Sequence, residues 1–170
     1  MTAYRIGPLD AGADTAGFQC GQAALDEYIR RYASQDVRRN LARVFVASPV
    51  GDSRRLAGYF TLGAGSVDCR DLPASLARKL PRYPVPVALI GRLAVASECQ
   101  GDGLGAILLA DACHKVVQAS AVLAVAGIIV DAKDASAARF YAHFGFVPMP
   151  GQSNRLVLPA KALTAIRSRP

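Results

Sequence analysis

The chain has 170 residues, carries a net charge of +7, and is 52% hydrophobic and 19% charged. This length can bury one hydrophobic core, and the composition excludes disordered, collagen-like and purely ionic tail proteins. No run approaches the roughly 18 apolar residues of a membrane-spanning helix, and the start lacks the basic and apolar blocks of a signal peptide. We therefore expect one cytoplasmic domain over residues 1–170, with its core at about 4–158, a polar tail at 159–170 and no membrane association.

The four cysteines form no metal or redox motif. Cys20, Cys69, Cys99 and Cys113 lie far apart, and no pair has C-x-x-C spacing. His114 beside Cys113 could indicate a nucleophile or a ligand, but both residues fall in an apolar helical stretch, where packed side chains are commoner. We predict buried thiols and no bound metal.

Arginine supplies most of the positive charge, 16 of the 20 basic residues. Its planar guanidinium suits phosphate, which favours a polyanionic partner. The alternative, an Arg-rich surface from a biased genome, stays open on composition alone. The basic residues concentrate in two segments, the first with Arg30, Arg31, Arg38, Arg39 and Arg43 against Asp36, and the second with Arg78, Lys79 and Arg82.

The first half of the chain predicts a strand, a helix and a hairpin. Tyr4–Ile6 is typical of a short strand, and a helix follows Cys20 and Gly21. Val44–Ala47 and Leu56–Leu62 are β-rich runs close enough for an antiparallel hairpin. The helix has one apolar stripe and turns its charges to solvent; the stripe is Leu25, Tyr28, Ile29 and Tyr32, and the charges are Glu27, Arg30 and Arg31.

The second half predicts a central strand followed by alternating helices and strands. Val87–Val95 suits a strand buried on both faces, and its one charge, Arg92, must reach a site edge or form a structural ion pair. Prolines bracket a short helix at Ser75–Leu80 before it. Two later helices are predicted, one at 103–118 and one that Asp134 caps and that runs to about 144. Two later strands are predicted at 125–130 and 154–158, and the tail from 161 frays or contacts a partner.

A glycine-rich segment lies between the central strand and the next helix. A strand, a glycine turn and a helix N-terminus can bind an anion, because glycines let the backbone approach and successive N–H groups point at a phosphate. A plain tight turn is the alternative, and the segment is neither a P-loop nor a G-x-G-x-x-G fingerprint. The segment is Gln100, Gly101, Asp102, Gly103, Leu104 and Gly105.

This spacing matches Gln/Arg-x-x-Gly-x-Gly/Ala, and the chain resembles the GNAT acyltransferases, which use that loop for the pyrophosphate of acetyl-CoA. The resemblance implies an α/β (α+β) fold with a mixed, mostly antiparallel twisted sheet of six to seven strands and about four flanking helices. It also implies that the central strand is splayed from its neighbour, so that the backbone of Leu93, Ala94 and Val95 pairs with the pantetheine arm.

A second motif resembles the family's Asn-x-x-Ala-x-x-Phe-Tyr-x-x-x-Gly-Phe. Here it runs from Asp134 through Ala137, Phe140 and Tyr141 to Phe146, with Asp in place of the first Asn, a swap that affects one polar cofactor contact. By this resemblance Asp134, Ala137 and Phe140 lie at the cofactor. Tyr141 is then the general acid that protonates the departing CoA thiolate; a core tyrosine is the alternative.

The sequence indicates the acetyl acceptor less clearly than the acetyl donor. The central strand contains no Glu, Asp or His to act as general base, and Glu98 lies just beyond it. A lysine amine, with a pKa of about 10.4, needs help to lose its proton, whereas an α-amine near pKa 8 is partly neutral at pH 7. The missing base favours an α-amine, although a water chain could also serve. A basic surface and an α-amine acceptor together suggest aminoacyl-tRNA.

Several further segments resemble the GNAT toxins of bacterial toxin–antitoxin modules, the TacT and AtaT group. These segments are Phe18–Tyr28, Gly58–Leu62, Tyr83–Pro86, Gly91–Val95 and Val130–Ala132. The resemblance implies acetylation of charged tRNA, arrest of translation, a homodimer and a ribbon-helix-helix antitoxin. The candidates for the RNA path are Arg30, Arg31, Arg38, Arg39, Arg78, Lys79 and Arg92; a solvated charged face is the alternative.

Two other functions remain open from the sequence. An acetyltransferase for a small amine or a protein N-terminus would act without RNA and depend little on salt. A degenerate GNAT fold would only bind CoA or a regulatory partner, and the presence of both the glycine loop and Tyr141 speaks against it.

Overall fold

The computed structural model describes residues 2–167, except for the side chains of Ser153 and of residues 164–167. Its strands form a seven-stranded sheet in the order β1-β2-β3-β4-β5-β7-β6. The β1–β2, β2–β3, β5–β7 and β6–β7 pairs are antiparallel, and β4–β5 is parallel, which confirms the predicted fold class. The strands are β1 (Tyr4–Pro8), β2 (Arg43–Pro49), β3 (Gly58–Val67), β4 (Val85–Val95), β5 (Gly127–Asp131), β6 (Val147–Met149) and β7 (Gln152–Pro159).

Six α-helical segments accompany the sheet within residues 2–167, where the sequence predicted about four. None of the helices in this range is long and apolar enough to cross a membrane. The helices are α1 (Ala23–Glu27), α2 (Ala33–Arg38), α3 (Ala74–Ala77), α4 (Leu104–Ala119), α5 (Ala135–His143) and α6 (Ala160–Arg167); a π-helical turn (Tyr28–Tyr32) joins α1 to α2, and 3-10 turns cover Cys69–Asp71 and Ser97–Cys99.

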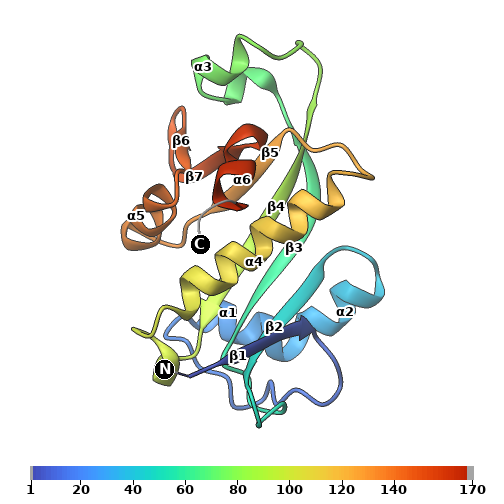
Figure 1. The fold of residues 1–170 in the computed structure, drawn as a ribbon, viewed down its shortest axis with the longest axis vertical. Helices are drawn as coiled ribbons and strands as arrows, with labels where there is room; N and C mark the ends of the chain where they lie inside the picture. The colour runs from blue at the N-terminus through green and yellow to red at the C-terminus, as the bar shows by residue number, and fades with distance from the viewer. Residues whose placement is uncertain (1, 168–170) are drawn as a thin grey trace. The chain divides into compact units, whose positions relative to one another are not determined.

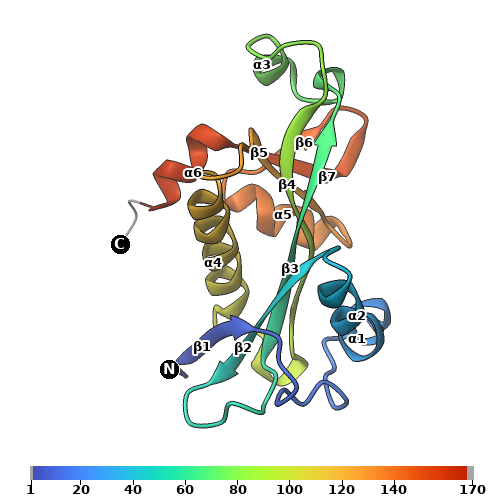
Figure 2. The ribbon, with the colours of Figure 1, turned by 90° about the vertical axis from the view of Figure 1, so that its right-hand side faces the viewer.

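The chain divides into two compact units, of which the first, unit 1, consists of Met1–Gly63 and Gly91–Ala112. The two faces of β3 here are covered by different helices (Figure 2). Tyr59 points to the α1 side, where its hydroxyl donates to the Leu25 carbonyl at 2.6 Å. The neighbouring Gly58 faces α4, because a Cβ there would lie 2.9 Å from Leu108 Cδ1. Because side chains alternate along a strand, α1 and α4 lie on opposite faces of β3.

Unit 2 consists of Ala64–Ile90 and Cys113–Pro170. Strands β5, β7 and β6 lie side by side in it, and α6 follows directly on β7 (Figure 1). Backbone hydrogen bonds tie Ala126 to Pro86 at 2.8 Å and Ala160 to Ala126 at 3.0 Å, so α6 starts against the β4–β5 pair. The unit has its own apolar cluster of buried residues: Val67, Cys69, Leu72, Val85, Val87, Ile129, Met149 and Val157.

Two local expectations differ from the structure, and one strand was not predicted. Tyr32 is 49% exposed although it lies on the predicted stripe, because the π-helical turn inserts an extra residue and brings Ala33 to the core instead. The tail is not frayed over its described part, because residues 160–167 form α6 and bury Leu163. The short strand β6 was not predicted.

Candidate active site

The glycine loop of unit 1 has the backbone that an anion site needs. Gly101 and Gly103 adopt left-handed φ values of 90° and 83°, and a Cβ at either position would meet no atom within 4 Å. Helix α4 begins at the next residue, Leu104, whose buried side chain anchors it. The first amides of a helix have no intrahelical acceptor, so the start of α4 offers N–H groups that an anion could accept from.

Gln100 holds this loop in place. Its Nε2 donates to the carbonyls of Cys20 and Val95, both at 3.0 Å, and the Ser97 amide donates to the Gln19 carbonyl at 2.8 Å. The side chain therefore joins the loop to the segment before α1 and to the end of β4. The sequence pattern indicated Gln100 as a cofactor contact; the structure shows its amide nitrogen used within the protein.

Strand β4 extends beyond its parallel pairing. The register with β5 runs from Ala88 opposite Ile128 to Ile90 opposite Val130, and β4 then continues to Val95. Ala94 is buried, whereas Leu93 and Val95 are half-buried. This end of β4 fits the splayed strand that the sequence predicted; its pairing with a pantetheine arm stays a prediction.

Tyr141 lies on α5 in unit 2 with its ring packed and its hydroxyl unengaged. The side chain is 6% exposed, and its ring packs edge-on against Phe140 and Phe146, with centroids 5.3 and 5.6 Å away. The hydroxyl makes no hydrogen bond to any side chain or backbone group of the described residues. Burial raises the pKa of Tyr141 to about 12, so the hydroxyl is protonated at physiological pH and can donate a proton.

Asp134 has a structural task on the same helix. Its Oδ1 accepts from the Ala137 amide at 2.8 Å, which caps the N-terminus of α5 as the sequence predicted. Asn caps helices about as well as Asp, so the swap from the family's Asn leaves this contact intact. Ala137 and Phe140 are half-buried, and Phe140 packs on Phe144 at 5.1 Å.

A profile of the family described as the acetyltransferase (GNAT) domain matches residues 42–148, which is more than half of the chain. The tRNA-acetylating toxin of Mycobacterium tuberculosis is 37% identical over 153 residues, 90% of each chain. The chain belongs to the GNAT acetyltransferases.

Other relatives of this GNAT chain are toxins of the TacT and AtaT type. A probable toxin TacT of Sinorhizobium fredii is 25% identical over 95% of this chain and 93% of its own. AtaT in complex with acetyl-methionyl-tRNAfMet has a TM-score of 0.89 at 30% identity, covering 98% of this chain and all of AtaT. A tyrosine-to-phenylalanine mutant of KacT has a TM-score of 0.90 at 27% identity, covering 96% of this chain and 98% of KacT.

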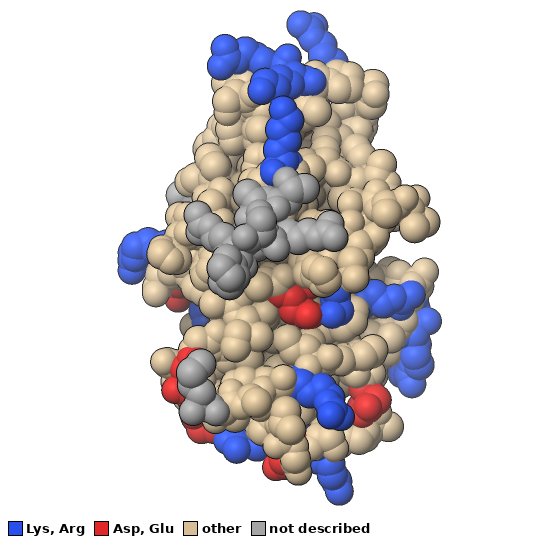
Figure 3. Space-filling view, in the orientation of Figure 1, with Lys and Arg blue, Asp and Glu red and all other residues tan. Residues whose placement is uncertain are grey.

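Most predicted RNA contacts of this GNAT chain are exposed. Lys and Arg side chains gather over α3, and no acidic side chain is visible there in this view (Figure 3). Three of the exposed members have partners: Arg31 forms an ion pair with Glu27 at 3.6 Å, Arg30 donates to the Phe18 carbonyl at 3.5 Å, and Arg78 donates to the Ala74 carbonyl at 3.3 Å. The exposed members are Arg30, Arg31, Arg38 and Arg39 in unit 1 and Arg78 and Lys79 in unit 2.

Arg92 differs from the rest of the set, because its guanidinium lies on an aromatic ring. Its Cζ is 3.6 Å from the centroid of Tyr28, on the π-helical turn, and the Tyr28 hydroxyl donates to Asp36 at 2.9 Å. Burial, followed by the bond to Asp36, raises the pKa of Tyr28 to about 12. Arg92 thus has an aromatic partner where the sequence offered an ion pair, and its place at the edge of a site stays a prediction. Sequence analysis missed Tyr28 as the partner, which only the fold brings to β4.

We expect Arg92 and Tyr28 to be energetically coupled. A double-mutant cycle with Arg92→Met and Tyr28→Leu measures the coupling by chemical denaturation, and a cation–π contact of a half-buried arginine contributes about 1 kcal/mol. Arg38→Met, which removes an exposed arginine from α2, is the control and changes the unfolding free energy by less than about 0.5 kcal/mol. Additive effects of the Arg92 and Tyr28 substitutions would show that the contact does not link β4 to the helix.

The cysteines are packed in the core, as the sequence predicted. All four cysteines are buried and free of disulfides, and burial raises the pKa of Cys113 to about 12, which makes it a packed thiol and no nucleophile. Residues 2–167 contain no group of three or more His, Cys, Asp or Glu that could hold a metal ion.

Proposed function

We propose that this GNAT chain transfers the acetyl group of acetyl-CoA to the α-amine of aminoacyl-tRNA and so stops translation. The identity to the tRNA-acetylating toxin over 90% of the chain supports the acceptor, and Tyr141, with its packed ring and unengaged hydroxyl, carries the chemistry. Charged tRNA is used in the cytoplasm, and we place the activity there.

The residues of unit 1 fit the phosphate end of acetyl-CoA. The left-handed glycines at 101 and 103 leave open space above the backbone, and the amides of the loop and of the first turn of α4 bind the pyrophosphate. Gln100 orients the loop from behind through the Cys20 and Val95 carbonyls. The backbone at 93–95 takes the pantetheine arm, and the thioester, when bound, supplies an electrophilic carbonyl carbon.

Tyr141 completes the transfer as the general acid. The amine nitrogen bonds to the acyl carbon, the carbon–sulfur bond breaks, and the Tyr141 hydroxyl gives its proton to the leaving sulfur. The amine loses its proton to water, and the tyrosinate is reprotonated from solvent. Because the Tyr141 pKa is raised, the proton is present on the enzyme at every physiological pH.

Three carboxylates of unit 1 are engaged within the protein and β4 itself contains none, which supports an acceptor that needs no strong base. Asp26 accepts from the Cys20 amide at 2.9 Å, Asp36 accepts from Tyr28, and Glu98 pairs with Arg55 at 3.4 Å. An α-amine with a pKa of about 8 is already partly neutral at pH 7 and can react without a strong general base, unlike a lysine amine.

Transfer of labelled acetyl from acetyl-CoA to total charged tRNA tests the acceptor. We expect label on charged tRNA alone, with none on uncharged tRNA or on charged tRNA stripped by mild alkali. The rate at low substrate falls steeply as salt rises, because phosphate contacts release counterions. Labelling of small amines or peptides with no effect of salt would instead favour the small-amine or protein acetyltransferase.

AtaT structures also suggest the partners. One holds the C-terminus of the antitoxin AtaR together with acetyl-CoA, at 28% identity and a TM-score of 0.83. For this chain we propose a cognate antitoxin of the ribbon-helix-helix class and a homodimeric state.

A further inference from the structure

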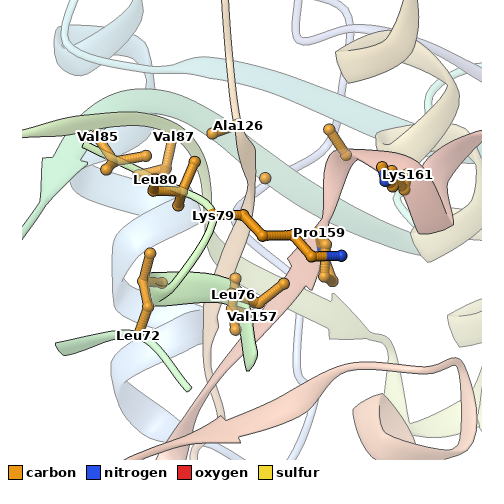
Figure 4. Close-up of a pocket in the computed structure, with 12 residues that line it drawn as sticks. Leu72, Leu76, Lys79, Leu80, Val85, Val87, Ala126, Val157, Pro159 and Lys161 are labelled. Carbon is orange, nitrogen blue, oxygen red and sulfur yellow. The ribbon is translucent and has the colours of Figure 1, made fainter. Parts of the chain in front are cut away.

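Unit 1 contains a polar cavity whose residues have no part in the proposed acetyl transfer. Its volume is about 500 Å³, against about 170 Å³ for a cavity of unit 2 that is lined mainly by aliphatic side chains (Figure 4). The larger cavity lies over the paired strands β1 and β2. We call it the Arg5 groove, and the lining residues used below are Arg5, Gly7, Asp10, Val46, Ser48 and Pro49.

The floor of the Arg5 groove is one face of the β1–β2 pair. In the antiparallel register Arg5 lies opposite Ser48, and two residues further along the same face Gly7 lies opposite Val46. Val46 and Ser48 are both buried, and the Ser48 hydroxyl donates to the Ser53 carbonyl at 3.3 Å. A Cβ at Gly7 would meet no atom within 4 Å. The sheet therefore fixes the floor, and the space above Gly7 is open.

Two opposite charges line the Arg5 groove without pairing with each other. The Arg5 guanidinium forms neither a hydrogen bond nor an ion pair within residues 2–167. Asp10, on the segment after β1, accepts from the Gly12 amide at 2.8 Å through Oδ1, and no group in the described part of the chain donates to its Oδ2. Both side chains are exposed, so each can bind a ligand group of the opposite sign.

The two charges discriminate between classes of ligand. A simple anion such as phosphate would pair with Arg5 but would be repelled by Asp10. A purely apolar molecule would remove both charges from water without giving them partners, which is costly. A zwitterion supplies a carboxylate for Arg5 and an ammonium for Asp10, and both contacts are charge-assisted hydrogen bonds. The apolar Val46 and Pro49 favour a zwitterion that also carries an apolar side chain.

We propose that the Arg5 groove binds a free amino acid or a dipeptide with an apolar side chain, its carboxylate on Arg5, its ammonium on Asp10 and its side chain against Val46. The volume of the groove admits either ligand. This inference goes beyond the proposed function, because the groove does not depend on which amine the enzyme acetylates. It gives the chain a small-molecule site in addition to those for acetyl-CoA and the acceptor.

Isothermal titration calorimetry of the full chain with L-leucine and L-leucyl-L-leucine tests the ligand class. We expect at least one of these zwitterions to saturate the protein below about 1 mM. Isocaproate lacks the amine of leucine and isoamylamine lacks the carboxylate, so each leaves one charge of the groove without a partner. Both should bind at least about tenfold more weakly than the better zwitterion. Equal binding of isocaproate or of inorganic phosphate, or no saturation by about 10 mM zwitterion, would overturn the proposal.

Three substitutions assign the binding to the groove. Gly7→Leu fills the open space, and because Gly7 is a strand residue outside the left-handed region, thermal stability should not fall. Arg5→Met removes the cation, and Asp10→Asn removes the anion while keeping Oδ1 for the Gly12 amide. Each should weaken zwitterion binding about tenfold, whereas Arg38→Met, on α2, should change it less than about twofold. Equal losses in Arg5→Met and Arg38→Met would show that net charge and not the groove holds the ligand.

Backbone amide NMR spectra of the unsubstituted chain locate the ligand independently. We expect the better zwitterion to shift the signals of Gly7 and Ser48 and to leave those of Ile129 and Val157 in unit 2 unchanged. Shifts confined to unit 2, or to Arg92 on β4, would place the ligand at another site, the acceptor site included, and would contradict the proposal.

Discussion

Tyr141→Phe is expected to abolish most turnover while leaving the fold and acetyl-CoA binding intact. Removing a general acid lowers the rate about 10²–10⁴-fold. The Tyr141 hydroxyl bonds to no described residue, so its removal orphans no partner and the Phe ring keeps the contacts with Phe140 and Phe146. Single-turnover acetyl transfer, acetyl-CoA titration and thermal unfolding measure the three quantities. The matched control is Tyr83→Phe, which removes the same atom from an exposed ring in unit 2.

The pH profile separates an acid from a packing residue. An acid works only while protonated, and the pKa of Tyr141 is raised to about 12. The wild-type rate should therefore rise as an α-amine acceptor loses its proton near pH ~8 and then stay level up to about pH 10. Full turnover in Tyr141→Phe with normal acetyl-CoA affinity would remove Tyr141 from the mechanism and leave it as a core tyrosine.

Features encoded within a few residues were predictable. Apolar runs gave the positions of β2, β3 and β4, and the short-range capping pattern at Asp134 identified the start of α5 because an N-cap bond spans only three residues. The glycine loop was predictable for the same reason, because Gly101 and Gly103 adopt left-handed φ values that glycine favours whatever its distant neighbours. At these positions the residue type alone indicates the local backbone conformation.

Features decided by distant contacts were not predictable. The π-helical turn that exposes Tyr32 begins at Tyr28, which contacts Arg92 on β4 and Asp36 on α2, and neither contact can be inferred from the spacing of apolar residues. Gln100 matched a cofactor motif, yet its carbonyl acceptor at Cys20 lies far away in the chain. Helix α6 had an available signal, since Ala160–Leu163 are good helix formers, but their polar surroundings made the segment resemble a tail.

Gly103→Ala in the glycine loop is expected to weaken the binding of acetyl-CoA selectively. A left-handed alanine costs about 1–2 kcal/mol, and its strained backbone turns the amides of the loop away from the phosphate. We expect KM for acetyl-CoA to rise about tenfold, equivalent to about 1.4 kcal/mol of binding, with a smaller change in kcat.

Gly51→Ala separates this effect from backbone strain. Gly51 lies in the β2–β3 turn with a φ of 95°, and a Cβ there also meets nothing within 4 Å, so the two substitutions impose the same strain in equally open surroundings. Both should lower the unfolding free energy by a similar amount, about 1–2 kcal/mol, but only Gly103→Ala should raise KM. If both variants kept the wild-type KM, the amides at 101–105 could not be the pyrophosphate site, and the anion would have to bind on side chains instead. Arg55, which pairs with Glu98 beside the loop, would then be the first residue to substitute.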